Sequence, residues 1–374
     1  MLASTTKVPI DRSIQRHLTR DEEFNRAVGP SRRVTMTDVA QVAGCSQTTV
    51  SFVLNNTPGI KLSAATRSRV IAAARALRYA APDFAHVEPP ASLKPHVDGT
   101  IGFVVDHLAT SPEAVVAIEG ARQACWNAGN VLLVAQTLND AQMEPRTIQV
   151  LTDSGISALI YMAIFTREIA AQEFLYSIGV PVVLVNCYTA DHAFPAVVPS
   201  EIAGGDGSTR YLMRYGHSRI ATITGEPWME AAQSRLKGYR RALATGDIPF
   251  DPDLVVQGDW SASAGYKATM QLMALANPPT AIFCQNDRTA IGCYEALKEN
   301  GLRIPEDISV VGYDDEEISR HLHPQLTTSI LPHRAMGRWA IEQLESMTKS
   351  GPGRHPITKL ECPLVERASV AQPK

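Results

Sequence analysis

The sequence predicts a small all-α helix-turn-helix domain followed by an α/β region of two doubly wound, parallel-sheet lobes. Near the start, two short helical patterns flank a glycine, which is typical of two helices joined by a tight turn. From Thr100 onward, apolar strand-like runs alternate with polar-faced helical segments, which indicates βαβ units covered on both faces. At 374 residues the chain is too long for one domain, and its alternating part is too long for one sheet.

The first helix begins after Thr35 and ends at Gly44. Thr35 can cap it, and Asp38 lies three residues on, where a negative charge meets the positive end of the helix dipole. Gly44 ends the helix because glycine adopts the left-handed conformation without strain. The expected buried stripe is Val39, Val42 and Ala43.

The second helix is capped by Ser46 and carries the informative face. We expect its buried side to be Val50, Val53 and Leu54. Its outward side would be Thr48, Ser51, Phe52 and Asn55, with Gln47 at the exposed start. This face has small donors and acceptors and no acid, as a helix in the major groove requires. An ordinary helical hairpin in a globular core is the alternative on these two helices alone.

A third helix is expected from Ala64 to Tyr79, capped by Ser63. Its predicted buried stripe is Val70, Ile71, Ala74 and Leu77. Residues 31–80 hold seven basic residues and one acid, a net charge of +6 in a chain whose total is −3. Such a concentration of positive charge indicates phosphate binding.

One long string of residues carries a family resemblance: Val34-Thr35-x-x-Asp38-Val39-Ala40-x-x-Ala43-Gly44-x-Ser46-x-x-Thr49-Val50-Ser51, then Asn55, Thr66-Arg67 and Leu77-x-Tyr79-x-x-Pro82. It resembles the headpiece of the LacI/GalR family of bacterial transcription regulators. The resemblance continues through nearly all of the chain from Val34. It implies two periplasmic-binding-protein-like lobes, with crossovers near Val198 and Ile330 and a last strand near Thr358 to Val365 returning to the second lobe.

The expected organisation has four parts. Residues 1–33 form a mobile, solvated tail, 34–80 the DNA-binding domain and 81–98 a linker. Residues 99–370 form the effector-binding and dimerisation domain, with an N-lobe of about 99–198 and 331–350 and a C-lobe of about 199–330 and 351–370. In the family the linker forms a hinge helix that wedges a leucine into the minor groove. Here Pro89 stands at that place, so Val87 or Phe84 substitutes or the linker is a tether.

The expected strands and helices of the lobes alternate along the chain. The strands are 101–105, 131–135, 158–162, 182–185, 220–224, 281–284 and 309–313. The helices are 113–128, 205–214, 232–244, 264–276 and 289–301.

Polar residues at the carboxyl ends of these strands predict a ligand cleft. The candidates are Asp106, Asn186, Arg235, Trp260, Asn286 and Asp314. Carboxylates and amides suit the hydroxyls of a polyol, a guanidinium is a bidentate donor, and an indole ring suits a C–H face. In the family, residues matching Arg235, Trp260, Asn286 and Asp314 line the effector pocket, whereas Asp106 and Asn186 match by strand register only.

Four of the six candidates have a structural alternative. Asp106 and Asn186 can be turn residues, Trp260 can be plain core and Arg235 can form a structural ion pair. We expect Asp287 to cap the helix that follows it. Asp315 and Glu316 are expected at the surface.

The sequence indicates no cofactor, metal site or enzymatic activity. Its six cysteines lack metal-ligand spacing, and no Walker loop, G-x-S-x-G or H-E-x-x-H motif occurs. No apolar run reaches the ~18–20 residues that a membrane helix needs. We therefore expect a cytoplasmic protein without a membrane partner.

The sequence thus predicts a homodimeric repressor that reads a near-palindromic operator in double-stranded DNA and responds to a small molecule, most simply a saccharide. Gln47 and Thr48 would contact base edges, and Phe52 a thymine methyl group. The phosphate contacts would be Thr37, Ser46, Thr49, Ser51 and Asn55. The alternatives are a solute-binding protein, a sugar-processing enzyme, and a regulator whose ligand is a corepressor.

Overall fold

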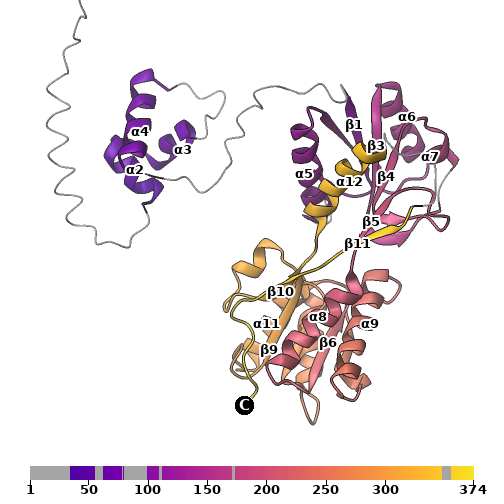
Figure 1. Ribbon diagram of the computed structural model, residues 1–374. Helices are drawn as coiled ribbons and strands as arrows, with labels where there is room; N and C mark the ends of the chain where they lie inside the picture. The colour runs from indigo at the N-terminus through magenta and orange to yellow at the C-terminus, as the bar shows by residue number, and fades with distance from the viewer. Residues whose placement is uncertain are drawn as a thin grey trace, which may run out of the picture. The chain divides into compact units, whose positions relative to one another are not determined.

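The computed structural model describes residues 34–54, 62–77, 79, 99–108, 112–170, 173–347 and 355–374. The chain divides into two compact units, Met1–Ala91 and Ser92–Lys374 (Figure 1). The expected tail, the linker and Asn55 lie outside the described residues. Within the described ranges, no helix combines the length and the apolar character needed to cross a membrane.

Among its described residues, the first unit holds three helices, α2 (Met36–Ala43), α3 (Gln47–Leu54) and α4 (Ala64–Ala76). They enclose one small core of buried side chains: Val39, Ala40, Ala43, Val50, Val53, Val70, Ala73 and Ala74. The helix starts follow from local sequence. Thr35 and Asp38 form a capping box in which the Thr35 backbone N–H donates to Asp38 Oδ2 at 2.7 Å. Gly44 ends α2 with φ at 63°, in the region where glycine is unstrained.

Three details of this unit differ from the prediction. Val42 is 39% exposed and Ile71 is 37% exposed, so neither belongs to the core. The third helix ends at Ala76 rather than at Tyr79. For Val42 the reason is packing: α2 contacts α4, and the residues that α2 gives to the shared core are Val39, Ala40 and Ala43, so Val42 lies outside the buried face.

The second unit contains two six-stranded sheets, as the predicted fold class requires. The first has the order β11-β5-β4-β3-β1-β2 and is parallel throughout. The second has the order β12-β10-β9-β8-β6-β7, in which only β12 is antiparallel. The strands are β1 (Thr100–Val105), β2 (Val131–Gln136), β3 (Ile156–Glu168), β4 (Val182–Tyr188), β5 (Ala196–Pro199), β6 (Ile220–Thr224), β7 (Val255–Gln257), β8 (Ala281–Cys284), β9 (Ser309–Asp314), β10 (Thr327–Ile330), β11 (Ile357–Leu360) and β12 (Leu364–Val365).

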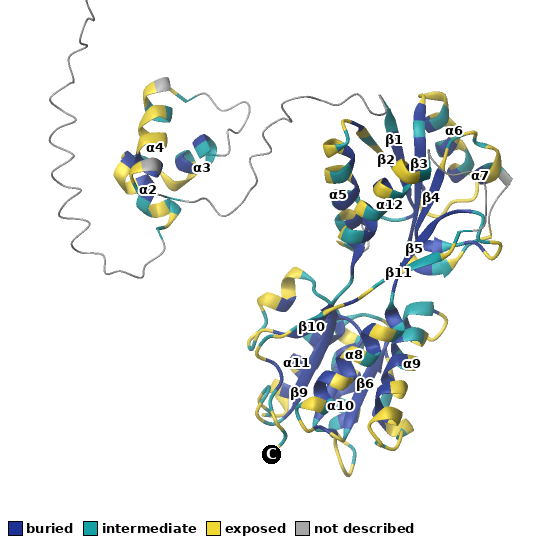
Figure 2. Ribbon diagram, in the orientation of Figure 1, coloured by how far each residue is buried: buried dark blue, intermediate teal, exposed yellow. Residues whose placement is uncertain are grey.

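Helices cover both sheets, and the central strands between them are the most buried part of each lobe (Figure 2). In the first lobe the helices are α5 (Pro112–Asn127), α6 (Met143–Asp153), α7 (Glu173–Ser177) and α12 (His333–Met347). In the second lobe they are α8 (Glu201–Arg214), α9 (Glu230–Thr245), α10 (Ala262–Met273) and α11 (Asp287–Glu299), with 3-10 turns at Pro252–Leu254 and Glu317–Arg320.

The chain passes between the lobes three times: after β5, after β10 and after β11. The three passages lie side by side, because Ser200 N–H donates to Leu360 O at 2.7 Å and Ile330 N–H donates to Pro363 O at 2.8 Å. The single strand expected near Thr358 to Val365 is wrong. It is two strands, of which β11 pairs with β5 in the first lobe and β12 with β10 in the second. Pro363 lies between them and has no N–H to continue a ladder.

Helices α8 and α9 touch backbone to backbone. A Cβ atom on Gly205 would lie 2.3 Å from Arg235 O, and one on Gly238 would lie 2.3 Å from Ile202 O. Only glycine permits this approach. The contact brings the start of α8 beside the first turns of α9, and so sets Glu201 against Arg235.

Candidate functional site

The outward face of α3 is polar and uncharged, and its start is open to solvent. Gln47 and Thr48 are exposed, as is Thr37 on α2, whereas Ser51 and Phe52 are half-buried. No acidic or basic residue lies in α3. Its first turn therefore presents donors and acceptors without a charge that would repel or bind phosphate indiscriminately.

Two of the predicted phosphate contacts also hold the helix start. Ser46 Oγ accepts from Thr49 N–H at 3.1 Å, which is the expected cap, and the two hydroxyls are 2.8 Å apart. Thr49 is half-buried and Ser46 exposed. A hydroxyl donates once and accepts twice, so this pair keeps hydrogen-bonding capacity for a further partner.

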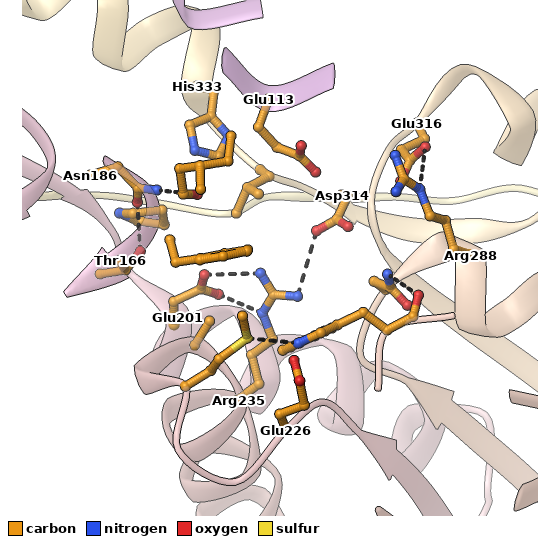
Figure 3. A pocket seen from close by; sticks show the side chains of 18 of the residues that line it. Glu113, Thr166, Asn186, Glu201, Glu226, Arg235, Arg288, Asp314, Glu316 and His333 are labelled. Carbon is orange, nitrogen blue, oxygen red and sulfur yellow. Dashed lines mark hydrogen bonds and ion pairs between the residues drawn. The ribbon is translucent and has the colours of Figure 1, made fainter. Parts of the chain in front are cut away.

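The second candidate site is a cavity of about 300 Å³ between the two sheets of the second unit (Figure 3). Five of the six predicted cleft residues line it: Asn186, Arg235, Trp260, Asn286 and Asp314. The other lining residues are Glu113, Ile164, Phe165, Thr166, Pro199, Glu201, Glu226, Met229, Ala231, Asp259, Arg288, Glu316, Leu331 and His333.

Arg235 is the centre of the charged side of the cavity and is 3% exposed. Its Nε and Nη2 donate to both carboxylate oxygens of Glu201, at 2.7 and 2.9 Å. Nη1 donates to the Gln285 carbonyl oxygen and lies 3.5 Å from Asp314 Oδ1. Burial opposes the charge of Arg235, but Glu201 and Asp314 raise its pKa above the ordinary value, so it stays ionised.

Asp314 ends β9 with φ at 107°, a conformation that costs energy for a residue with a Cβ. Burial raises the pKa of Asp314 well above its usual range, Arg235 opposes the shift, and Glu113 adds to it. The side chain is 8% exposed. Strain, burial and crowding by acids in one place are typical of a ligand-binding carboxylate.

The two asparagines lie at the cavity but hold other parts of the chain. Asn186 Nδ2 donates to Ala163 O and Ile164 O, at 3.0 and 2.9 Å, and Thr166 Oγ1 donates to Asn186 Oδ1 at 2.5 Å. Asn286 caps α11, accepts from Thr289 N–H at 2.9 Å and donates to Trp260 O at 3.0 Å. Each amide oxygen retains a second lone pair for a ligand.

Trp260 has φ at 67° and is half-buried. A Cβ atom on Gly225 would lie 1.9 Å from its ring, so the indole rests directly against that glycine. Its Nε1 donates to Met229 Sδ at 2.7 Å, and the Arg235 guanidinium lies 5.5 Å from the ring centre. The ring is therefore held in place before any ligand arrives.

Asp106 does not line the cavity. Its Oδ1 accepts from His107 N–H and Ile164 N–H, at 2.9 and 2.8 Å, and Oδ2 accepts from Arg167 Nη2 at 3.1 Å. It is 3% exposed. The carboxylate accepts a hydrogen bond from the backbone of β3. The position of Asp106 at the end of a strand did not reveal this partner.

Two expectations about neighbouring acids are wrong. Neither Asp315 nor Glu316 is at the surface. The Asp315 side chain is 11% exposed and pairs with Arg367, and Glu316 lines the cavity, with its side chain 15% exposed and Arg288 Nε at 3.1 Å from Oε1. Asp287 does not cap α11, because Asn286 does so. Asp287 is fully buried and accepts from Thr328 Oγ1 at 2.6 Å and Glu316 N–H at 2.8 Å. Burial raises the pKa of Asp287 to about 7.

Besides Glu316, sequence reasoning missed six ionisable residues of the cavity: Glu113, Glu201, Glu226, Asp259, Arg288 and His333. His333 begins α12, directly after the second passage between the lobes. It is 2% exposed, and within the described ranges neither ring nitrogen has a hydrogen-bond partner. Burial and Arg235 lower the pKa of His333 to about 3, so its ring is neutral. The sequence could have indicated these residues only by their position, because each lies just after a strand or in the first turn of a helix where the two lobes meet.

Comparisons with known proteins give a family match in each of the two units. Residues 35–82 match the family described as bacterial regulatory proteins, lacI family. Residues 209–370 match the family described as periplasmic binding protein-like domain.

Curated relatives align over most of their length. The HTH-type transcriptional repressor PurR of Aliivibrio fischeri is 30% identical over 338 residues, which covers 90% of this chain and 98% of the relative. The ribose operon repressor of Escherichia coli is 33% identical over 310 residues, covering 83% and 92% respectively.

Solved structures of whole regulators also superpose. The transcriptional regulator CelR in complex with cellobiose is 28% identical, with a TM-score of 0.62, covering 90% of this chain and 100% of that chain. The lac repressor dimer bound to operator and the anti-inducer ONPF is 27% identical, with a TM-score of 0.60, covering 91% and 100%.

Proposed function

The chain belongs to the lacI family of bacterial regulatory proteins, and on that premise we propose which of its surfaces bind operator, effector and a second copy. It is a DNA-binding transcriptional repressor controlled by a small-molecule effector. We assign DNA binding to residues 34–80, ligand binding to 99–370 and their connection to 81–98. The observation that carries this assignment is the presence, in one chain, of an exposed uncharged helix start and a cavity that charged side chains and an indole ring line.

For the operator, Gln47 and Thr48 are the base-reading residues, because they are the exposed side chains of the first turn of α3. In helix-turn-helix proteins the start of the recognition helix meets base edges in the major groove. Phe52 would meet a thymine methyl group, and Asn55 would add a phosphate contact. The remaining phosphate contacts are Thr37, Ser46, Thr49 and Ser51.

For the effector, the cavity favours a small polyhydroxylated molecule. Arg235 and Asp314 supply a fixed donor and acceptor, and the Trp260 ring offers a flat apolar surface. Rigid, pre-oriented groups of this kind lower the cost of binding. The cellobiose bound to a similar regulator supports a saccharide. We assign no catalytic role to the cleft, and we place the protein in the cytoplasm with its operator.

For dimerisation, β2 is the exposed edge of the first sheet. Three of its apolar side chains are 55%, 39% and 41% exposed: Val131, Leu133 and Val134. Trp126, at the end of the adjacent α5, is 52% exposed. An apolar sheet edge of this kind is a self-association surface, and a similar repressor is a dimer. Leu133→Asp with Val134→Asp should yield monomers in sedimentation, whereas Phe250→Asp, on an exposed apolar residue of the second lobe, should not.

The experiment that tests the function is a fluorescence-anisotropy titration of the promoter duplex beside the gene, repeated with a panel of sugars. We expect specific binding that a sugar weakens, with a coupling of about 1–3 kcal/mol that is reciprocal. A sugar that strengthens binding would make the ligand a corepressor. Indifference to every duplex would refute the proposal.

A further inference from the structure

The charges of the cavity point to a narrower class of effector than sugars in general. This inference rests on the proposed function, because it takes the cavity between the lobes as the effector site. We propose that the effector carries a primary amine on a small hydroxylated skeleton, and that its ammonium group lies against Glu113, Asp314 and Glu316.

The first support is the imbalance of charge. Six carboxylates line the cavity against two guanidiniums. The carboxylates are Glu113, Glu201, Glu226, Asp259, Asp314 and Glu316, and the guanidiniums are Arg235 and Arg288. A phosphate or carboxylate ligand would oppose the ionisation of these carboxyl groups, a neutral sugar would not favour it, and a cationic ligand would favour it.

The second support is how the guanidiniums are used. Arg235 binds both oxygens of Glu201 and reaches Asp314 only at 3.5 Å. Arg288 pairs with Glu316 at 3.1 Å. Neither guanidinium is within ion-pair distance of Glu113 or Glu226 in the described part of the chain.

The third support is a cluster of three carboxylates at one side of the cavity. One oxygen each from Glu113, Asp314 and Glu316 lies within 4.8 Å of the others. Glu113 Oε2 is buried and has no hydrogen-bond partner among the described residues. Burial and Glu316 raise the pKa of Glu113, and burial raises that of Asp314. An ammonium group has three N–H donors and can meet all three acids.

An independent observation shows that the cavity is built for a ligand. His333 is only 2% exposed, and neither ring nitrogen has a hydrogen-bond partner within the described ranges. Figure 3 shows its ring on the same side of the cavity as Glu113. A buried polar group left unpaired is destabilising. A neutral imidazole offers one donor and one acceptor, which suits a hydroxyl group near the amine.

The size of the cavity limits the skeleton. Its volume of about 300 Å³ is at the small end of the range for ligand sites. Trp260 and Phe165 supply aromatic surface, which also favours a cation close to a ring. An amino sugar or amino polyol of monosaccharide size meets every one of these conditions.

The test compares matched ligands on the full-length protein by isothermal titration calorimetry. The amines are D-glucosamine, D-galactosamine, D-mannosamine and 1-amino-1-deoxy-D-sorbitol, each beside its hydroxyl and N-acetyl counterparts. We expect at least one amine to bind roughly ten- to a hundredfold more tightly than its neutral counterparts, the range for hydrogen bonds to charged groups. Binding should release protons, because an ammonium group favours the ionised carboxylates.

Two variants on the same helix make the test specific. Glu113→Gln should abolish the preference for the amine over its hydroxyl counterpart. Glu119→Gln removes one negative charge from α5 outside the cavity, where Glu119 pairs with Arg122 at 2.6 Å, and should leave the preference intact. A cooperative melt of both variants checks that they fold.

The remaining outcomes separate this inference from the proposed function. If a neutral sugar binds as tightly as its amine counterpart or more tightly, the inference of an amine effector is refuted, and the proposal of a sugar-responsive repressor stands. The inference also fails if no amine in the panel binds, or if CaCl₂ or MgCl₂ alone binds in a Glu113-dependent way. Loss of operator recognition in the anisotropy assay would instead refute the repressor, whatever the cavity binds.

Discussion

The recognition helix and the ligand cavity both present polar groups to a partner, but they differ in how far those groups are buried and bonded within the protein. On α3 the base-reading side chains Gln47 and Thr48 are exposed and adjacent in sequence. In the cavity the functional side chains are buried, distant in sequence and bonded to one another, as Arg235 is to Glu201. A surface that meets water can leave donors free, whereas a buried cavity must satisfy them. Substitutions should therefore alter specificity at α3 and both stability and response at the cavity.

The largest effect is expected at Arg235. Arg235→Ala leaves the buried Glu201 carboxylate unpaired, which should destabilise the second unit by about 3–5 kcal/mol. Urea denaturation followed by tryptophan fluorescence reports on this unit alone, because all four tryptophans lie in it. Arg235→Met with Glu201→Leu removes both charges and should recover most of the loss. A loss below about 1 kcal/mol in the single variant would show that the pair is not effectively buried.

At α3 the corresponding change should leave stability untouched. Thr48→Ala should reduce discrimination at one operator base pair by about 1–3 kcal/mol and keep the salt dependence of binding. Anisotropy titrations on operators changed one base pair at a time measure this. Ser68→Ala, on the exposed face of α4, is the control. Equal weakening on every sequence would contradict base reading by Thr48.

A substitution at His333 tests whether a residue of the cavity lowers the stability of the second unit in exchange for ligand binding. His333→Phe removes two unpaired buried nitrogens and should stabilise the second unit by about 1 kcal/mol while weakening the effector response. Stability measured by urea and response measured by anisotropy should move in opposite directions. If both fall, the ring is structural.

The same histidine makes a prediction about pH. Burial lowers the pKa of His333 to about 3 in the folded protein, against roughly 6.5 unfolded. The unfolded chain therefore takes up the proton first, and stability falls as pH decreases from about 6.5 toward 3. His333→Phe should lose that part of the pH dependence, so its advantage over the wild type should grow as pH falls. An advantage that stays constant with pH would contradict the shift.

The smallest effect is expected at the start of α2. Thr35→Ala removes the cap bonded to Asp38 and should cost about 1 kcal/mol. Because no tryptophan lies in this unit, hydrogen exchange of the α2 amides is the measurement. Thr35→Ser keeps the hydroxyl and should restore most of the protection. Unchanged exchange in the alanine variant would show that packing alone holds the helix.

The sequence predicted most accurately what depends on neighbours along the chain. The caps at Thr35, Ser46 and Ser63 and the left-handed Gly44 were predictable because their partners lie within three or four residues. The fold class followed from alternating periodicity, which is also local. Val42 was misjudged because its exposure depends on how closely α4 approaches α2.

The cavity was predictable only in part. The strand ends gave Asn186, Asn286 and Asp314, since parallel strands deliver their carboxyl ends to one edge. Glu201 and His333 could not be found this way, because they begin helices after a passage between lobes. The partner of Asp106 was equally hidden, since Ile164 lies 58 residues away.

The three adjacent passages between the lobes have a mechanical consequence. The passages are hydrogen-bonded to one another, Ser200 to Leu360 and Ile330 to Pro363. Three connected passages resist shear and twist of one lobe against the other better than a single passage would. We therefore expect the least restricted motion to be a change of the angle between the two lobes. A ligand bound in the cavity would then act on this one angle. A regulator needs no other change to signal that its cavity is occupied.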